Sequence, residues 1–342
     1  MTLSATPRAF ITGCAGTVLS REEEAFLRDT RPWGLILFRR NIGTPGQVAA
    51  LVEAFRAIVD RADAPVLIDQ EGGRVQRLGP PHWPVYPPAS VFADMASAGD
   101  GQRADESAHL GARLMANDLA ALGINVDCVP CADLRLPEGH GIIGDRAYGE
   151  TPQQVARLAR AAAEGLMSGG VLPVLKHIPG HGRARADSHE SLPVVTTSRD
   201  ELEATDFEAF RLLANLPLGM TAHVVYTAID ADRPATTSPR VIEEIIRGHI
   251  GFDGALMSDD LSMGALEGSL ASRAEASFAA GCDLVLHCNG KMDEMRDVAS
   301  CSPELSGDAA RRCEAALSRL VIPAAPELVQ ARARFSDMIA AS

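Results

Sequence analysis

The chain has 342 residues, with 32 Lys and Arg set against 45 Asp and Glu, so its formal net charge is −13. Hydrophobic residues make up 46% and charged residues 23%, which is typical of a globular protein and excludes a disordered chain or a collagen-like repeat. Because no basic excess is available to neutralise phosphates, we expect neither nucleic acid nor an anionic membrane surface as a partner.

Eight short apolar runs alternate with longer amphipathic segments along the chain. Several of them are continuously apolar, which is typical of parallel strands that are buried on both faces. The predicted strands cover residues 10–13, 34–38, 65–69, 124–129, 172–177, 218–223, 255–258 and 283–287.

The segments between these strands carry recognisable helix starts. Thr44 and Thr151 each precede a proline and lie three residues before a glutamine, and Ser20 and Ser198 each lie three residues before a glutamate. These are the spacings of N-terminal helix caps. After Thr151, the apolar residues Val155, Leu158, Ala162 and Leu166 recur at helical spacing and are expected to face the sheet.

Repeated strand–helix units without a break in composition predict an α/β fold, specifically a single (β/α)₈ TIM barrel. An open doubly wound sheet is the alternative, although the dinucleotide and P-loop glycine motifs are missing. We expect one domain over residues 1–342, with a C-terminal helical extension from about residue 303. The last helix is expected over residues 327–341, on the outside of the barrel.

Seven cysteines are scattered along the chain. A secreted disulfide framework is normally dense and even in number, so we expect a reducing compartment and a cytoplasmic protein. Cys128 and Cys131 have the spacing of a redox or zinc pair, but no second pair exists and the neighbouring valines favour a buried strand. We predict a packing role for both. No stretch approaches the ~20 apolar residues that span a bilayer.

Charged side chains are concentrated where several predicted strands end. In a barrel these ends build the active site, so the pattern predicts an enzyme. The residues are Asp69, Glu71 and Arg74 after the third strand, Lys176 and His177 after the fifth, His223 after the sixth, and Asp259 and Asp260 after the seventh.

The loop after the fifth strand contains Asp187 and His189, two residues apart, so the carboxylate can orient the imidazole for proton transfer near neutral pH. The histidines and aspartates of this region could also ligate zinc. However, no His-Glu-x-x-His pair fixes a geometry, and Lys176 lies next to His177. We therefore predict acid–base chemistry without a metal or another cofactor. A serine-hydrolase elbow is also missing.

Five sequence segments, taken together in their order along the chain, are specific enough to indicate a protein family. They are residues 69–77 (DQEGGRVQR), 143–148 (IGDRAY), 176–182 (KHIPGHG) with 187–189 (DSH), 220–226 (MTAHVVY) with 232–236 (DRPAT), and 258–263 (SDDLSM). In order and spacing they resemble glycoside hydrolase family 3, in particular its single-domain β-N-acetylglucosaminidases. The resemblance extends from about the first strand to Ala265 and beyond.

The resemblance implies a (β/α)₈ barrel and retaining hydrolysis of terminal, non-reducing β-linked N-acetylglucosamine. Asp259 matches the nucleophile that forms a covalent glycosyl-enzyme intermediate, and His189, paired with Asp187, matches the acid/base. The residues that match sugar-binding positions are Asp69, Arg77, Arg146, Lys176 and His177. Asp260 is left with a structural role, because the family places the nucleophile at the first aspartate.

The implied partner is a small carbohydrate, a muropeptide or a chitobiose-like fragment, and the implied process is the removal of N-acetylglucosamine from 1,6-anhydro-muropeptides in cytoplasmic peptidoglycan recycling. We expect a monomer. Two alternatives stay open: a β-glucosidase or xylosidase of the same fold, and a sugar-binding protein without turnover.

Overall fold

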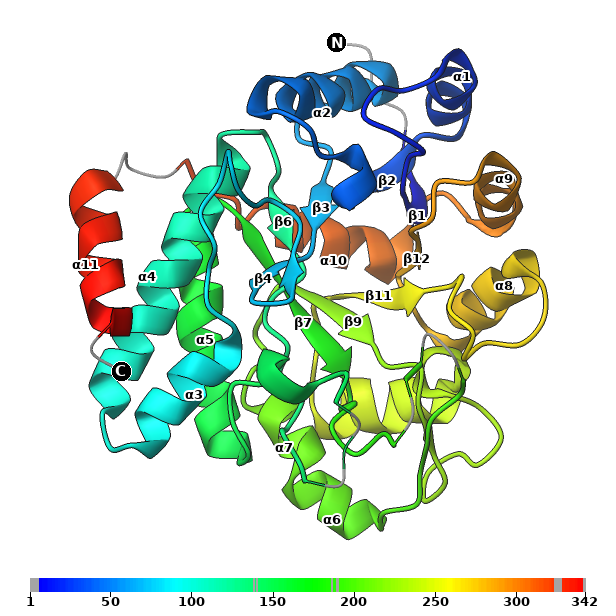
Figure 1. Cartoon of the computed structure of the whole chain (residues 1–342). Helices are drawn as coiled ribbons and strands as arrows, with labels where there is room; N and C mark the ends of the chain where they lie inside the picture. The colour runs from blue at the N-terminus through cyan, green and yellow to red at the C-terminus, as the bar shows by residue number, and fades with distance from the viewer. Residues whose placement is uncertain are drawn as a thin grey trace.

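Eight parallel strands close into a barrel with the order β1-β12-β11-β9-β7-β6-β3-β2, surrounded by helices (Figure 1). The computed structural model describes residues 6–137, 139, 141–185, 187–188, 191–322 and 328–340. Each barrel strand overlaps one predicted strand, so the (β/α)₈ barrel is confirmed and the open sheet is wrong. The barrel strands are β1 (Arg8–Thr12), β2 (Pro32–Leu37), β3 (Val66–Ile68), β6 (Val126–Asp127), β7 (Leu172–Ile178), β9 (Leu218–Thr221), β11 (Ala255–Asp260) and β12 (Leu284–His287).

Helices follow the strands around the barrel. The predicted caps are confirmed, since Ser20, Thr44, Thr151 and Ser198 each accept a hydrogen bond from the backbone N–H three residues later. The helices are α1 (Arg21–Thr30), α2 (Pro45–Val59), α3 (Ala89–Ser97), α4 (Gly101–Ala120), α5 (Pro152–Ser168), α6 (Arg199–Ala204), α7 (Asp206–Arg211), a π-helical segment η4 (Val241–His249), α8 (Leu270–Ala280) and α9 (Met292–Cys301).

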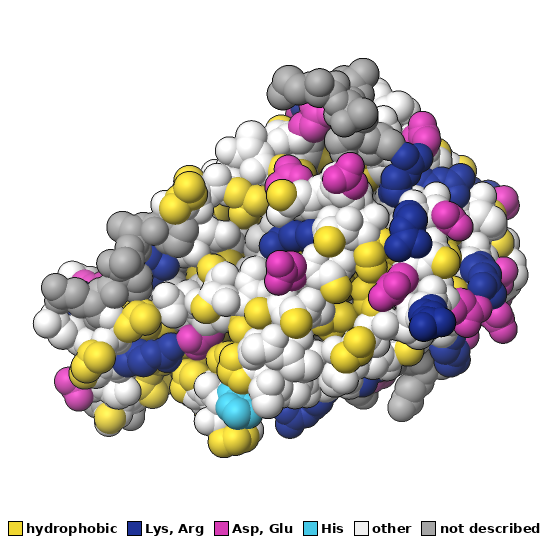
Figure 2. All heavy atoms as spheres, turned by 90° about the horizontal axis from the view of Figure 1, so that it is seen from above, with side chains coloured by type: hydrophobic (Ala, Val, Ile, Leu, Met, Phe, Trp, Pro, Cys, Tyr) yellow, Lys and Arg dark blue, Asp and Glu magenta, His cyan; other side chains and the backbone are white. Residues whose placement is uncertain are grey.

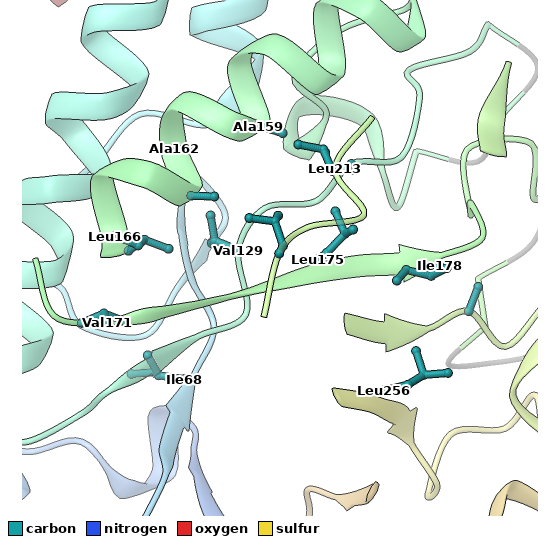
Figure 3. Close-up of a cluster of buried hydrophobic side chains, with 14 of the residues drawn as sticks. Ile68, Val129, Ala159, Ala162, Leu166, Val171, Leu175, Ile178, Leu213 and Leu256 are labelled. Atoms are coloured by element: carbon teal, nitrogen blue, oxygen red, sulfur yellow. The ribbon is translucent and has the colours of Figure 1, made fainter. Parts of the chain in front are cut away.

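Two apolar layers hold the barrel. Helix α5 packs its predicted face against the sheet, and Figure 3 shows Ala159, Ala162 and Leu166 over the side of β7 that carries Leu175. A second cluster takes side chains from all eight barrel strands and fills the interior. Helix α10 (Gly307–Leu317) adds Cys313 to that cluster and covers one end of the barrel.

Shorter elements complete the chain. They are the hairpin β4 (Gln70–Gly72) and β5 (Val75–Gln76), the pair β8 (Val194–Val195) and β10 (Val225–Tyr226), and the 3₁₀ turns η1 (Arg39–Asn41), η2 (Gly144–Arg146) and η3 (Ala235–Thr237). Helix α11 (Leu328–Ala340) lies beside α4 (Figure 1). The predicted ends of this last helix, residues 327 and 341, lie outside the described residues.

All seven cysteines are free thiols and six are buried, Cys128 and Cys131 among them. Over the face that Figure 2 shows, acidic side chains are interspersed with basic ones rather than gathered into one patch. Among the described residues, no helix is both long enough and apolar enough to cross a membrane.

Candidate active site

A pocket opens at the carboxyl ends of the barrel strands. It is lined by side chains from the ends of β2, β3, β7, β9, β11 and β12 and from the loops that follow them. The polar side chains are Asp69, Glu71, Arg74, Arg77, Arg146, Lys176, His177, Asp259 and Asp260, and the apolar ones include Ile36, Phe38, Met220 and Met263. All five predicted sugar-binding residues and the predicted nucleophile thus meet in one pocket.

Five of these side chains form a ladder of alternating charge across the pocket. Arg77 Nη2 donates to Asp69 at 2.9 Å, and Lys176 Nζ lies 3.1 Å from Asp69 and 2.6 Å from Glu71. Glu71 also receives a bidentate pair of hydrogen bonds from Arg146, both at 2.8 Å. Because each charge is held by its neighbours, the ladder presents rigid donors and acceptors to a ligand.

The hairpin after β3 places three of the ladder's members. Gln70 Oε1 accepts the backbone N–H groups of Arg77 and Leu78, both at 3.0 Å, and so folds β5 back on β4. Gly72 has a φ of +88°, and a Cβ there would clash with the carbonyl of Pro87. This tight turn brings Asp69, Glu71 and Arg77 to the same side of the pocket.

The ladder shifts the pKa values of its members in opposite directions. Burial disfavours the charged form of Lys176, but Glu71 and Asp69 outweigh it and raise the pKa of the ammonium above its usual value. Burial likewise opposes ionisation of the two carboxyls. Lys176 and Arg77 nevertheless lower the pKa of Asp69, and Arg146 and Lys176 lower the pKa of Glu71 to about 2. The ladder is therefore fully charged at neutral pH.

We expect the ladder to make the fold sensitive to acid. A carboxyl whose pKa is depressed in the folded state stabilises the fold above its unfolded pKa and loses that contribution as the pH falls toward the folded value. For the pKa of Glu71 the window runs from the usual value of 4.5 down to about 2, and the loss is about 3 kcal/mol. Urea unfolding between neutral pH and about pH 2 measures it. Glu71→Gln should flatten the dependence, and an unchanged slope would contradict the assignment.

A second buried cluster lies against the pocket at Asp133. Asp133 Oδ2 lies 2.7 Å from His177 Nδ1 and accepts from Cys131 Sγ at 3.2 Å, and Oδ1 accepts from the backbone N–H of His181. Burial opposes ionisation of Asp133, but His177 lowers its pKa below the usual range. Burial and then His177 lower the pKa of His181 to about 4, so this ring is neutral at pH 7.

Cys131, Asp133 and His177 are close enough to hold a metal ion among the described residues. Their own hydrogen bonds already join the three groups, and burial followed by Asp133 raises the pKa of the Cys131 thiol well above its usual value. A protonated thiol is a poor zinc ligand. The donor set therefore fits a hydrogen-bonded cluster better than a metal centre.

The two aspartates at the end of β11 differ in their surroundings. The carboxylate of Asp260 accepts the backbone N–H and the hydroxyl of Ser262, at 3.0 and 2.6 Å, and the N–H of Cys288 at 3.2 Å. These bonds agree with the predicted structural role. Asp259 lines the pocket, and its Oδ1 accepts the N–H of Asp260 at 2.8 Å, which fixes the carboxylate at the strand end.

The loop after β7 is held at several points. The carbonyl of buried Ser188 accepts the N–H of Ala265, at 3.1 Å, from the loop that follows Asp259. Earlier in the loop, Arg183 pairs with Asp206 of α7 at 2.7 Å. The first of these contacts ties Ser188, the neighbour of the partly buried Asp187, to the loop that follows β11. The predicted acid/base, His189, lies outside the described residues.

Two carboxylates of the site were given no role in the sequence analysis. Glu71 was expected at the rim of the barrel but was not among the predicted sugar-binding residues, although it stands two residues after Asp69 in the DQEGG segment. Asp133 follows the fourth strand by a few residues, so a search of every strand end, rather than of the charged motifs alone, could have found it. Both act on residues that were predicted, namely Lys176, Arg146 and His177.

Together the fold and the pocket define a class: a (β/α)₈-barrel enzyme whose buried, fixed charges suit a small polyhydroxylated ligand. A family model described as "Glycosyl hydrolase family 3 N terminal domain" matches residues 12–321. The chain belongs to glycoside hydrolase family 3 and is a glycoside hydrolase, as its motifs predicted.

Comparisons with individual proteins agree with this family assignment. A β-hexosaminidase of Alkalilimnicola ehrlichii is 43% identical over 284 residues, which is 81% of this chain and 79% of the relative. The crystal structure of NagZ from Neisseria gonorrhoeae with N-trifluoroacetyl-D-glucosamine matches with a TM-score of 0.84 and 34% identity, covering 99% of this chain and 98% of that one. A family 3 β-N-acetylglucosaminidase from Paenibacillus sp. matches with a TM-score of 0.86 and 30% identity, covering 96% and 67%.

Proposed function

We propose that the protein is a retaining exo-β-N-acetylglucosaminidase that removes terminal, non-reducing β-linked N-acetylglucosamine. One observation carries the proposal: the barrel brings Asp259 into the same pocket as all the side chains predicted to bind the sugar. The preference for an N-acetylated sugar is supported by the relatives, which are named β-hexosaminidase and β-N-acetylglucosaminidase.

In the proposed mechanism, Asp259 attacks the anomeric carbon while His189 donates a proton to the leaving oxygen, and the glycosidic bond breaks. His189, now neutral, takes a proton from water as that water attacks the anomeric carbon, and the bond to Asp259 breaks. A neutral imidazole does not repel the released carboxylate of Asp259, which a second carboxylate would do. Asp187 stabilises the imidazolium form that donates the first proton.

The natural substrate is proposed to be a small fragment, a 1,6-anhydro-muropeptide met in cytoplasmic peptidoglycan recycling. Only 4% of the residues are aromatic, whereas polysaccharide-binding surfaces rely on aromatic platforms. We further propose that a monomer suffices, with one domain over residues 1–342 that carries a helical extension from about residue 303.

A substrate panel tests the proposal. Aryl β-glycosides of N-acetylglucosamine, glucose and xylose are compared by kcat/KM, and the anomer that forms first is followed by NMR. We expect the acetamido sugar to be preferred and the β-anomer to appear first. A preference for glucose or xylose would favour a related glycosidase, and binding without turnover would favour a sugar-binding protein. An α-anomer formed first would exclude the covalent intermediate.

A further inference from the structure

Asp133 and His177 form a carboxylate–imidazole pair that is separate from the predicted pair Asp187 and His189. The Asp133 side chain is fully buried, whereas that of His177 keeps 9% of its surface exposed, in the pocket that it lines. Nδ1 of the ring faces Asp133. The other ring nitrogen, Nε2, is therefore the atom that can meet a ligand.

We propose that Asp133 is a positioning residue that holds the His177 proton on Nδ1 and thereby leaves Nε2 as a hydrogen-bond acceptor for the substrate. The inference deepens the proposed function and rests on it for the identity of the ligand alone. The proton arrangement itself follows from the protein's own contacts.

The surroundings of Asp133 allow it to act only as an acceptor. Besides the ring and the Cys131 thiol, the backbone N–H groups of His177 and His181 point at its carboxylate, the former at 3.3 and 3.4 Å from the two oxygens. A protonated Asp133 would direct its O–H at one of these donors, which is unfavourable in a buried site. The proton between the two side chains therefore belongs to the imidazole.

This arrangement adds a type of contact that the charge ladder does not supply. Lys176, Arg77 and Arg146 can only donate hydrogen bonds, and the acceptors Asp69 and Asp259 carry full negative charge. Nε2 of a ring whose single proton is on Nδ1 is an uncharged acceptor. The substrate must then present a donor at this position, a hydroxyl or an amide N–H. A fluorine in place of that group could not donate, and the analogue would bind more weakly.

The tautomer can be measured in the full chain without a substrate, by NMR of ¹⁵N-labelled histidine rings, with His177 assigned by its loss in His177→Gln. We expect Nδ1 to carry the proton in the wild type and the population to shift toward Nε2–H in Asp133→Asn. Asp127→Asn is the matched control. Asp127 is also a fully buried aspartate of the barrel, and its carboxylate accepts from the backbone N–H of Gln70 at 2.9 Å. An Nε2–H ring in the wild type would overturn the proposal, even if Asp133→Asn failed to fold.

Binding of N-acetylglucosamine gives the functional readout. We expect Asp133→Asn to weaken it by about 2- to 10-fold, the usual effect of losing a hydrogen bond between uncharged groups. In a His177→Gln background the same substitution should add little, because Asp133 acts through the ring. Additive losses would overturn the positioning role. If the tautomer is as expected but no N-acetylglucosaminide is bound or cleaved, the proposed function fails while the proton arrangement stands.

Discussion

Replacing Asp259 with asparagine is expected to abolish turnover of both activated aryl N-acetylglucosaminides and unactivated disaccharides, with kcat falling by at least about 10⁴-fold. The amide oxygen can still accept the N–H of Asp260, which Asp259 Oδ1 accepts at 2.8 Å, so the strand end should keep its shape. An amide cannot form and release a glycosyl ester, so the loss should not depend on the leaving group. Steady-state kinetics on both substrates measure it.

His189→Ala provides the contrast within the same experiment. A variant without the proton donor should lose most of its activity on substrates with poor leaving groups. It should keep far more on activated aryl glycosides, because their leaving groups depart without protonation. A fluorinated N-acetylglucosamine donor with a good leaving group should also label the wild type, and mass spectrometry should find the label on the peptide that contains Asp259. A label on another residue, or equal losses for His189→Ala on both substrates, would contradict the assigned roles.

The barrel could be predicted from the sequence because its strands are buried on both faces. Strand β7 is buried throughout, which is why residues 172–177 form an unbroken apolar run until Lys176. The boundaries were less certain. The fourth predicted strand, residues 124–129, is only Val126–Asp127 in the structure, and the seventh continues through Asp260. Strand ends depend on pairing with neighbours, which a local pattern does not contain.

The site, like the fold, has features that could be predicted from the sequence and features that could not. Its motif residues could be predicted, because charges that follow apolar strands stand out in the sequence. The contacts among them could not, since Glu71 meets Arg146 across 75 residues and Asp133 meets His177 across 44. Closure of the barrel creates those contacts by placing the ends of β3, β6 and β7 side by side. Residues that orient others therefore emerge only with the fold.

Lys176→Met is expected to destabilise the fold by about 3–5 kcal/mol at neutral pH, because it leaves Asp69 and Glu71 with one cation fewer in a buried site. The Lys176 side chain is 2% exposed, and its ammonium is held by both carboxylates. Methionine fills most of the volume of the lysine stem, so the loss should be chiefly electrostatic. N-acetylglucosamine binding should weaken as well, because the ammonium group of Lys176, the hydrogen-bond donor at the centre of the ladder, is gone.

Acid separates this electrostatic loss from a packing defect. Without Lys176 the pKa values of Asp69 and Glu71 are depressed less in the folded state. The variant therefore loses less stability than the wild type as the pH falls from the unfolded carboxyl pKa of about 4 toward 2. The difference between variant and wild type in urea unfolding should therefore shrink in acid. Lys291→Met is the matched control, since Lys291 is 70% exposed and pairs with Glu294 at 2.9 Å; it should change stability by less than about 0.5 kcal/mol. If the Lys176→Met difference stayed the same at both pH values, packing rather than the charge ladder would explain it.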